Sequence, residues 1–186
     1  MNRPAVFVAL VLGAIIGGMA VEYWMTRNVP VPAAQQQAAA PTGTAGADVT
    51  FLKSVVPTQS HTMIDVGYHW TNLWFAAEKK NWPLARYLFG EARQSMRWTI
   101  LLRPVRQLSD GKTVDVKGLF TAIDMSAFAA VQLAVEDEDH AAFASSYKSA
   151  LEACYSCHVS AGLPHLRPVV PTSPASTLIS FEPLTK

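Results

Sequence analysis

The chain has 186 residues, of which 50% are hydrophobic and 16% are charged, and its formal net charge is only +1. Nucleic-acid-binding domains are usually strongly basic, so this balance argues against a nucleic-acid partner. Beyond the first 48 residues, roughly 138 remain, which is enough for one domain with a substantial hydrophobic core.

The N-terminal segment, residues 1–27, predicts contact with a membrane. Between Pro4 and Val21 it has no charged residue, and this length is marginally sufficient to span a bilayer. Arg3 favours a cytoplasmic N-terminus, although Arg27 on the other side weakens this bias. We expect an uncleaved anchor. The alternative is a cleaved signal peptide, for which the small residues near Ala20 offer a cleavage site.

Two further segments lack the periodicity of a folded core. Residues 28–48 are rich in Pro, Ala, Gln, Gly and Thr and have no charged residue between Asn28 and Asp48. This composition predicts a flexible linker. Residues 167–186 contain four prolines without periodicity, and we expect them to form an irregular C-terminal tail. Residues 49–166 between them would then form the folded domain.

Apolar residues in that domain recur at helical spacing. A first helix is predicted from Ser60 to Lys79, with Thr58 or Ser60 as its cap. A second follows the cap residue Asn81 and should end before Pro104. The residues expected to face inward on this second helix are Leu84, Tyr87, Leu88, Trp98 and Leu102.

Two more helices follow. The third should run from about Asp115 to Val135, and the fourth from the acidic residues 136–139 to Gly162, with Pro164 just beyond. No segment of this domain shows the pattern of a β-strand. Four helices with short connections predict an all-α fold, an antiparallel four-helix bundle.

The motif that indicates chemistry is Cys154-Tyr155-Ser156-Cys157-His158, which contains both cysteines of the chain. A C-x-x-C-H sequence is typical of covalent c-type haem attachment. The two thiols form thioethers with the porphyrin vinyl groups, and the adjacent imidazole becomes the proximal ligand of the iron. The motif therefore predicts one haem c held by Cys154, Cys157 and His158.

The two thiols could also serve in a redox-active dithiol or in a zinc site. A thioredoxin-like dithiol requires a βαβ context, which the sequence around the motif does not provide. A zinc site would need further ligands, and although His158 and His165 are available, their spacing is not that of a zinc motif.

In an antiparallel bundle the start of the first helix lies beside the end of the fourth. This places Met63, on the apolar stripe of the first helix, near the haem motif, where its thioether is a candidate sixth iron ligand. His61 and His69 are alternative ligands, and an open sixth position is a further possibility. The same end would hold arginines able to pair with haem propionates. These are Arg97, Arg103 and Arg106.

Seven cationic residues also fall within 28 positions of the chain. They form either a solvated helix face or a docking surface for a redox partner. They are Lys79, Lys80, Arg86, Arg93, Arg97, Arg103 and Arg106.

The chain resembles the class II c-type cytochromes, the four-helix family that includes cytochromes c prime, in having C-x-x-C-H on its last predicted helix and a distal candidate on its first. The resemblance implies haem on Cys154 and Cys157, a proximal His158, and Met63 at the position of the low-spin methionine. One feature departs from the family. Class II proteins usually carry a basic residue within a few positions of the haem histidine, whereas here the first one other than histidine is Arg167.

These features predict an exported monohaem electron carrier, not an enzyme, tethered to a bacterial inner membrane with its haem domain in the periplasm. Its partners would be redox proteins at the membrane, and the Gly13 and Gly17 spacing allows a homodimer. Three alternatives remain: a soluble periplasmic form after signal cleavage, a module that binds or senses nitric oxide or carbon monoxide, and a small peroxidase using His61 with an arginine.

Overall fold

The computed structural model describes residues 45–184, of which 67% are helical. The chain divides into two compact units at Val55 and Val56. In the first unit one helix is described, α2 (Ala45–Val55), which begins inside the predicted linker and was not anticipated. The predicted membrane segment lies outside the described residues. The remaining helices and both strands lie in the second unit.

Helices α3 (Gln59–Glu78) and α4 (Trp82–Leu102) begin at the predicted caps. The Thr58 hydroxyl accepts a hydrogen bond from the His61 amide at 3.2 Å, and the Asn81 side-chain oxygen accepts one from the Leu84 amide at 3.3 Å. Such side chains satisfy amides that the first helical turn leaves without partners. The predicted boundaries of both helices are confirmed to within a residue or two.

A short β-hairpin joins α4 to α5. Strands β1 (Val105–Gln107) and β2 (Thr113–Asp115) pair antiparallel, with Arg106 opposite Val114. The turn between them uses Gly111 at a φ of +84°. The expectation that the domain has no strand was therefore wrong. Strands of three residues are too short for an alternating pattern to distinguish them from a loop.

The third predicted helix is continuous but irregular. It consists of α5 (Val116–Ile123), a π-helical turn η2 (Asp124–Phe128) and α6 (Ala129–Glu136). Among the described residues, this is the one helical stretch long and apolar enough to cross a membrane, with a mean hydropathy of 1.6. Its buried residues Phe120, Phe128 and Val131 belong to the central core of the unit.

Helix α7 (His140–Ser160) carries the cysteine motif. It begins within the acidic segment as predicted, since the Asp139 carboxylate accepts hydrogen bonds from the amides of Ala141 and Ala142 at 2.9 and 3.0 Å. It ends where Gly162 takes a φ of +75°. A side chain there would be strained, and a Cβ would also stand 3.1 Å from Leu108 Cδ2.

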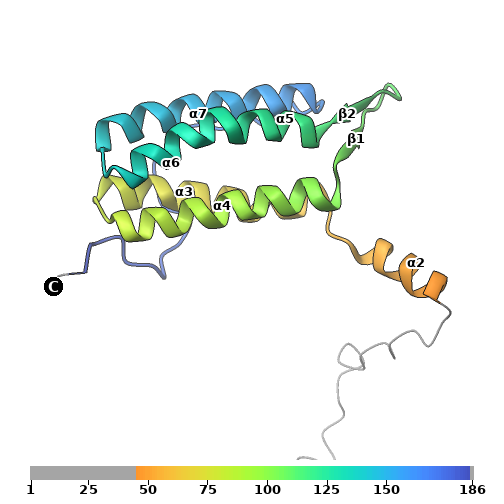
Figure 1. The fold of residues 1–186 in the computed structure, drawn as a ribbon, viewed down its shortest axis with the longest axis horizontal. Helices are drawn as coiled ribbons and strands as arrows, with labels where there is room; N and C mark the ends of the chain where they lie inside the picture. Colours follow the sequence, from red (N-terminus) through yellow and green to blue (C-terminus); the bar gives the residue numbers. More distant parts are fainter. Residues whose placement is uncertain (1–44, 185–186) are drawn as a thin grey trace, which may run out of the picture. The chain divides into compact units, whose positions relative to one another are not determined.

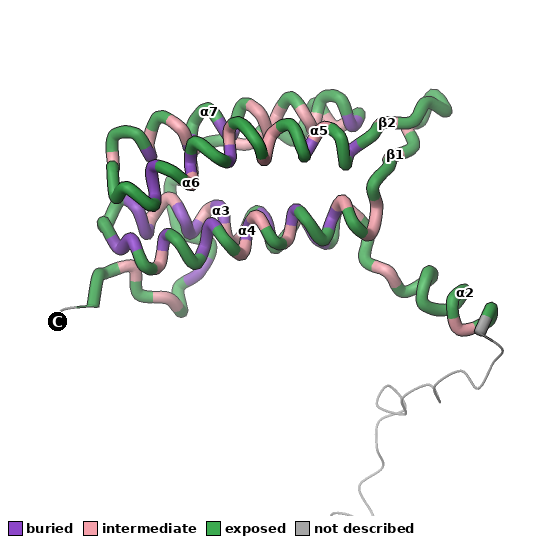
Figure 2. The backbone as a smooth tube through the Cα atoms, in the orientation of Figure 1, coloured by how far each residue is buried: buried purple, intermediate pink, exposed green. Residues whose placement is uncertain are grey.

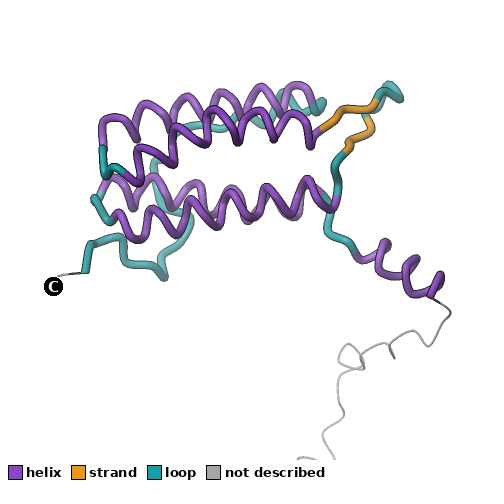
Figure 3. The backbone as a smooth tube through the Cα atoms, viewed as in Figure 1, coloured by secondary structure: helices purple, strands orange, loops and turns teal. Residues whose placement is uncertain are grey.

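Neighbouring helices of the unit run in opposite directions (Figures 1 and 3). The start of α3 meets the end of α4, where Gln59 donates to the Arg103 carbonyl at 2.8 Å. Tyr147 of α7 donates to the Trp70 carbonyl of α3 at 3.0 Å. Helices α3 and α4 form one layer, while α5, α6 and α7 form the other. The chain is thus all-α apart from the hairpin.

The core lies between these two layers (Figure 2). Its centre is an aromatic stack in which the Trp70 ring lies 4.7 Å from Phe128 and 5.2 Å from Tyr147. Trp74 adds a further contact with Tyr147 at 5.0 Å. Because the aromatic side chains come from α3, α7 and the π turn, they hold three helical segments together.

The inward face of α4 differs from the predicted stripe. Tyr87 and Trp98 were expected inside, yet they are 58% and 49% exposed. Ala85 and Ala92 are instead completely buried, together with Leu88. The prediction assigned large apolar side chains to the inward face of α4. The inner face of α4 carries small and bulky side chains side by side, because Trp82, Phe89 and Met96 are buried there as well.

The C-terminal residues 164–184 contain neither helix nor strand and cross the surface of the helices. The Asn72 side-chain oxygen accepts from the Ala175 amide at 3.0 Å, and Asn81 donates to the carbonyls of Phe181 and Glu182. Phe181 packs against the core. These contacts attach the irregular segment to α3 and to the start of α4.

Replacing Leu88 by Ala should lower the free energy of unfolding by about 2–5 kcal/mol, because it removes a completely buried side chain. Replacing Leu101, which lies on the same helix but is 70% exposed, should change it by less than about 0.5 kcal/mol. Urea unfolding measures both. Equal effects would contradict the inward face described here.

Candidate cofactor-attachment site

Cys154, Cys157 and His158 lie in the last two turns of α7, and all three are half-buried. Both cysteines are free thiols. Residues three apart on a helix share a face, so the two sulphurs are presented on the same side of α7. Cys154 packs against the central core, which places the motif at the edge of the hydrophobic interior.

Burial determines the protonation state of these thiols. It raises the pKa of Cys154 from 9.0 to about 12, with the neighbouring Cys157 as a secondary cause. Burial also raises the pKa of Cys157. Both groups are therefore protonated at neutral pH. A redox-active dithiol needs the opposite shift, a lowered thiol pKa.

The His158 ring is held by a backbone carbonyl. Its Nδ1 lies 2.6 Å from the carbonyl oxygen of Leu166. A carbonyl oxygen only accepts hydrogen bonds, so Nδ1 carries the proton. In the neutral imidazole, Nε2 then holds a free lone pair, which is the donor that a metal ion requires.

A short loop brings this carbonyl back to the helix. After Gly162 reverses the chain, the Leu163 amide donates to the His158 carbonyl at 2.8 Å. The Tyr155 hydroxyl donates to the Pro164 carbonyl at 3.2 Å. Arg167 then reaches the carboxylate of Glu152 at 3.0 Å. The loop of residues 161–167 therefore folds over the same turns of α7 that carry the motif.

Arg106 ties together the helix ends around the motif. Its Nε donates to the Ala161 carbonyl just beyond α7 at 2.9 Å, and its Nη1 donates to Gln59 at the start of α3 at 3.2 Å. Gln59 in turn donates to Arg103 at the end of α4. The start of the first predicted helix and the end of the fourth thus meet at one end of the unit, as expected.

The candidate sixth ligands occupy different environments. Met63 is half-buried and packs against the same core as Cys154. His61 is exposed on the first turn of α3. The His69 ring stacks edge-on with Tyr68 at 5.1 Å, and its Nδ1 is buried without a hydrogen-bond partner among residues 45–184. His165 is exposed in the loop after α7.

The arginines expected near haem propionates have other partners. Arg103 donates to the carbonyls of Val56 and Pro57 at 2.9 and 3.4 Å. Arg97 lies 3.6 Å from the Asp124 carboxylate. Together with the contacts of Arg106, these interactions make the three arginines structural, and they do not support the expected propionate contacts.

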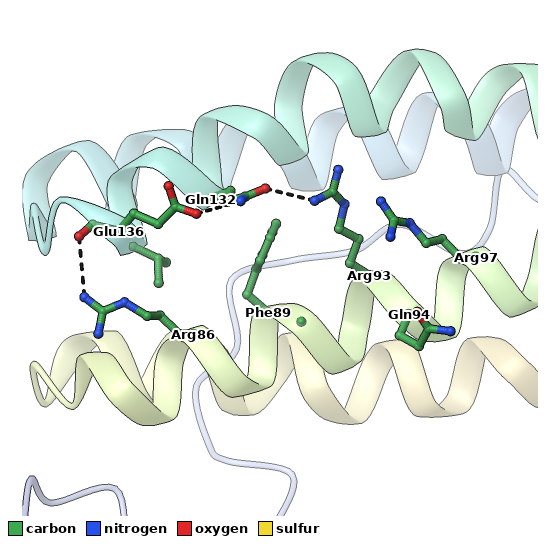
Figure 4. Close-up of a pocket in the computed structure, with 9 residues that line it drawn as sticks. Arg86, Phe89, Arg93, Gln94, Arg97, Gln132 and Glu136 are labelled. Atoms are coloured by element: carbon green, nitrogen blue, oxygen red, sulfur yellow. Dashed lines mark hydrogen bonds between the residues drawn. The ribbon is translucent and has the colours of Figure 1, made fainter.

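Three of the seven cationic residues, Arg86, Arg93 and Arg97, line a groove of about 300 Å³ between α4 and α6 (Figure 4). Arg93 binds Asp124 through two nitrogens at 2.5 and 3.0 Å, and Arg86 binds Glu138 at 2.7 Å. Because carboxylates pair with these arginines, this part of α4 fits a solvated helix face better than a basic docking surface.

The alternative chemistries of the thiols find little support. Among the described residues, no group of three or more His, Cys, Asp or Glu side chains is arranged to hold a metal ion, whereas structural zinc takes four protein ligands. The hairpin β1–β2 is antiparallel, so it does not supply the βαβ unit of a thioredoxin-like site.

Several residues of this site were not predicted. Leu166, Glu152 and Tyr155 act through the loop after α7, and the contact that matters most uses a main-chain oxygen, which no side-chain pattern reveals. Two features of the sequence could have indicated this loop: the helix end soon after His158, at Gly162, and the late position of the first basic residue after the motif, Arg167. The structure shows what this late position does, since the loop returns Arg167 to α7.

No protein-family model matches the chain, and the comparisons with curated proteins and with solved structures likewise found no significant match. The case for function therefore depends on the residues themselves.

In the full-length chain made without haem, Cys154 should react slowly with iodoacetamide. A pKa raised from 9.0 to about 12 lowers the thiolate fraction at pH 7 about a thousandfold. The rates can be compared in folded and urea-unfolded protein carrying Cys157→Ala, so that only one thiol reports. A folded-state rate above the unfolded one would instead indicate an activated thiol.

Proposed function

We propose that this chain is a monohaem c-type cytochrome that carries electrons on the periplasmic side of a bacterial inner membrane. Its helices α3, α4, α5–α6 and α7 would form the four-helix bundle of the class II cytochromes. Haem c, attached through Cys154 and Cys157, would supply a one-electron redox couple at its iron.

One observation carries the proposal: the hydrogen bond of His158 Nδ1 with the Leu166 carbonyl, beside two same-face thiols. Histidines that bind metals almost always donate their other N–H in this way, because the bond fixes the tautomer and the ring orientation. With Nδ1 protonated, Nε2 is the available donor. The donor set of two protonated thiols and one oriented imidazole fits covalent haem.

Each residue has a distinct part in this proposal. Cys154 and Cys157 supply the sulphurs of two thioethers, and their burial keeps them from the thiolate state that favours side reactions. His158 supplies the proximal nitrogen. Met63, half-buried against the same core, is the proposed sixth ligand, and its thioether favours a raised reduction potential.

Electron transfer requires little rearrangement of the protein around the redox centre. The aromatic stack of Trp70, Phe128 and Tyr147 makes the interior beside Cys154 rigid. Arg106 fixes the surrounding helix ends. We propose that residues 1–27, outside the described residues, anchor this domain near membrane redox partners, with residues 28–48 as the tether.

The alternatives differ in the sixth position. A module that binds nitric oxide or carbon monoxide would leave the sixth position open or weakly occupied. Ligation of the iron by Met63 would therefore favour the electron carrier over the gas-binding module. A peroxidase would need a distal base and a charge stabiliser. His61 is exposed, and Arg97, Arg103 and Arg106 already bind protein oxygens, so this arrangement is not favoured.

Protein matured in a host with haem-attachment machinery should keep its haem on a denaturing gel, seen by haem-dependent peroxidase staining. The double variant Cys154→Ala, Cys157→Ala should lose the stain, because no thioether can form. His165→Ala alters a histidine outside the motif and should retain it. Unstained wild-type protein would sink the proposal.

Met63→Ala should convert a low-spin spectrum that is insensitive to carbon monoxide into a high-spin spectrum that responds to it. Met96→Ala is the matched control, since Met96 is a buried methionine on α4 that is not proposed as a ligand. Identical spectra for wild type and Met63→Ala would remove Met63 from the iron. A wild type that already responds to carbon monoxide would favour the gas-binding alternative.

A further inference from the structure

We propose that Arg167, Tyr155 and Glu152 are positioning residues that hold the Leu166 carbonyl against His158 and so set the donor strength of the proximal imidazole. This inference rests on the proposed haem function and names the residues that regulate its potential. The hydrogen bond of the His158 ring goes to the Leu166 carbonyl, and the polar groups of the three residues bind elsewhere. They act through the loop of residues 161–167.

The loop cannot hold itself in place by local contacts alone. The Leu163 amide bonds to the His158 carbonyl and the Leu166 amide to the Leu163 carbonyl at 3.0 Å, which gives two successive turns. Both bonds lie within the loop or at the helix end. They define its curvature, but they do not fasten Leu166 to the side of α7 on which the His158 ring lies.

That attachment comes from three contacts with α7. The Tyr155 hydroxyl donates to the Pro164 carbonyl at 3.2 Å. One Arg167 nitrogen lies 3.0 and 3.1 Å from the two carboxylate oxygens of Glu152. The Arg167 guanidinium also stands 4.6 Å from the centre of the Tyr155 ring. Pro164 and Arg167 flank Leu166, so its carbonyl is held from both sides.

The C-terminal segment after Arg167 further restricts the position of Leu166. Val170 packs against the core, and the Ala175 amide bonds to Asn72 of α3. Leu166 therefore sits between contacts with α7 on one side and with α3 on the other. A proximal hydrogen bond in an exposed loop is in this way kept at 2.6 Å.

The chemical consequence follows from the direction of the bond. Donation from Nδ1 to a carbonyl increases the electron density of the imidazole and the basicity of Nε2. A more basic ligand stabilises the higher charge of ferric iron over ferrous iron. The contact should therefore lower the reduction potential, and loosening the loop should raise it.

The test uses full-length, haem-loaded protein carrying Arg167→Gln, Glu152→Gln or Tyr155→Phe. Redox titration should give a higher potential for each variant than for wild type. In the reduced protein, NMR should show solvent exchange of the His158 Nδ1 proton about five- to tenfold faster, the effect of weakening one hydrogen bond of ordinary strength. Glu152→Gln provides a second route to breaking the Arg167 pair.

The matched control is Arg86→Gln, which breaks another exposed pair, the one between Arg86 in the α4–α6 groove and Glu138. It should leave both the potential and the exchange rate unchanged. Haem-loaded variants with wild-type potential and wild-type exchange would overturn the positioning role alone. A wild type that carries no covalent haem would overturn it together with the proposed function.

Discussion

The end of helix α7 is the constraint on which the proposed chemistry of this molecule depends. Gly162 adopts a backbone conformation that other residues rarely take, and the chain turns back over the helix it has just left. The turn brings the Leu166 carbonyl to 2.6 Å from His158 Nδ1. Had α7 continued, that carbonyl would lie along the helix axis and away from the imidazole.

The surrounding fold serves to keep this helix end in place. Arg106 extends from the hairpin to the Ala161 carbonyl just beyond α7 and to the first turn of α3, so the two helices that carry the motif and Met63 are joined at one end. Towards the middle of these helices, the stacked rings of Trp70 and Tyr147 hold them by packing. Polar contacts at the rim and aromatic contacts inside thus act on the same pair of helices.

The sequence predicts this molecule best where the determinants are local. The cap Asn81, the pair of cap candidates Thr58 and Ser60, the helix start within residues 136–139 and the helix end at Gly162 were recognisable, because each depends on neighbours within a few residues. The inner face of α4 was predicted only in part: Leu88 is buried as expected, whereas Tyr87 and Trp98 are exposed. The strands of the β1–β2 hairpin are too short to show an alternating pattern, and the Leu166 contact uses a main-chain oxygen, which residue patterns do not encode.

The most direct test of the account is mass spectrometry of a proteolytic digest of the matured protein. We expect the peptide that contains Cys154 and Cys157 to carry the added mass of one haem, joined through both sulphurs. A digest in which that peptide has its unmodified mass, with both thiols free to be alkylated, would contradict the account.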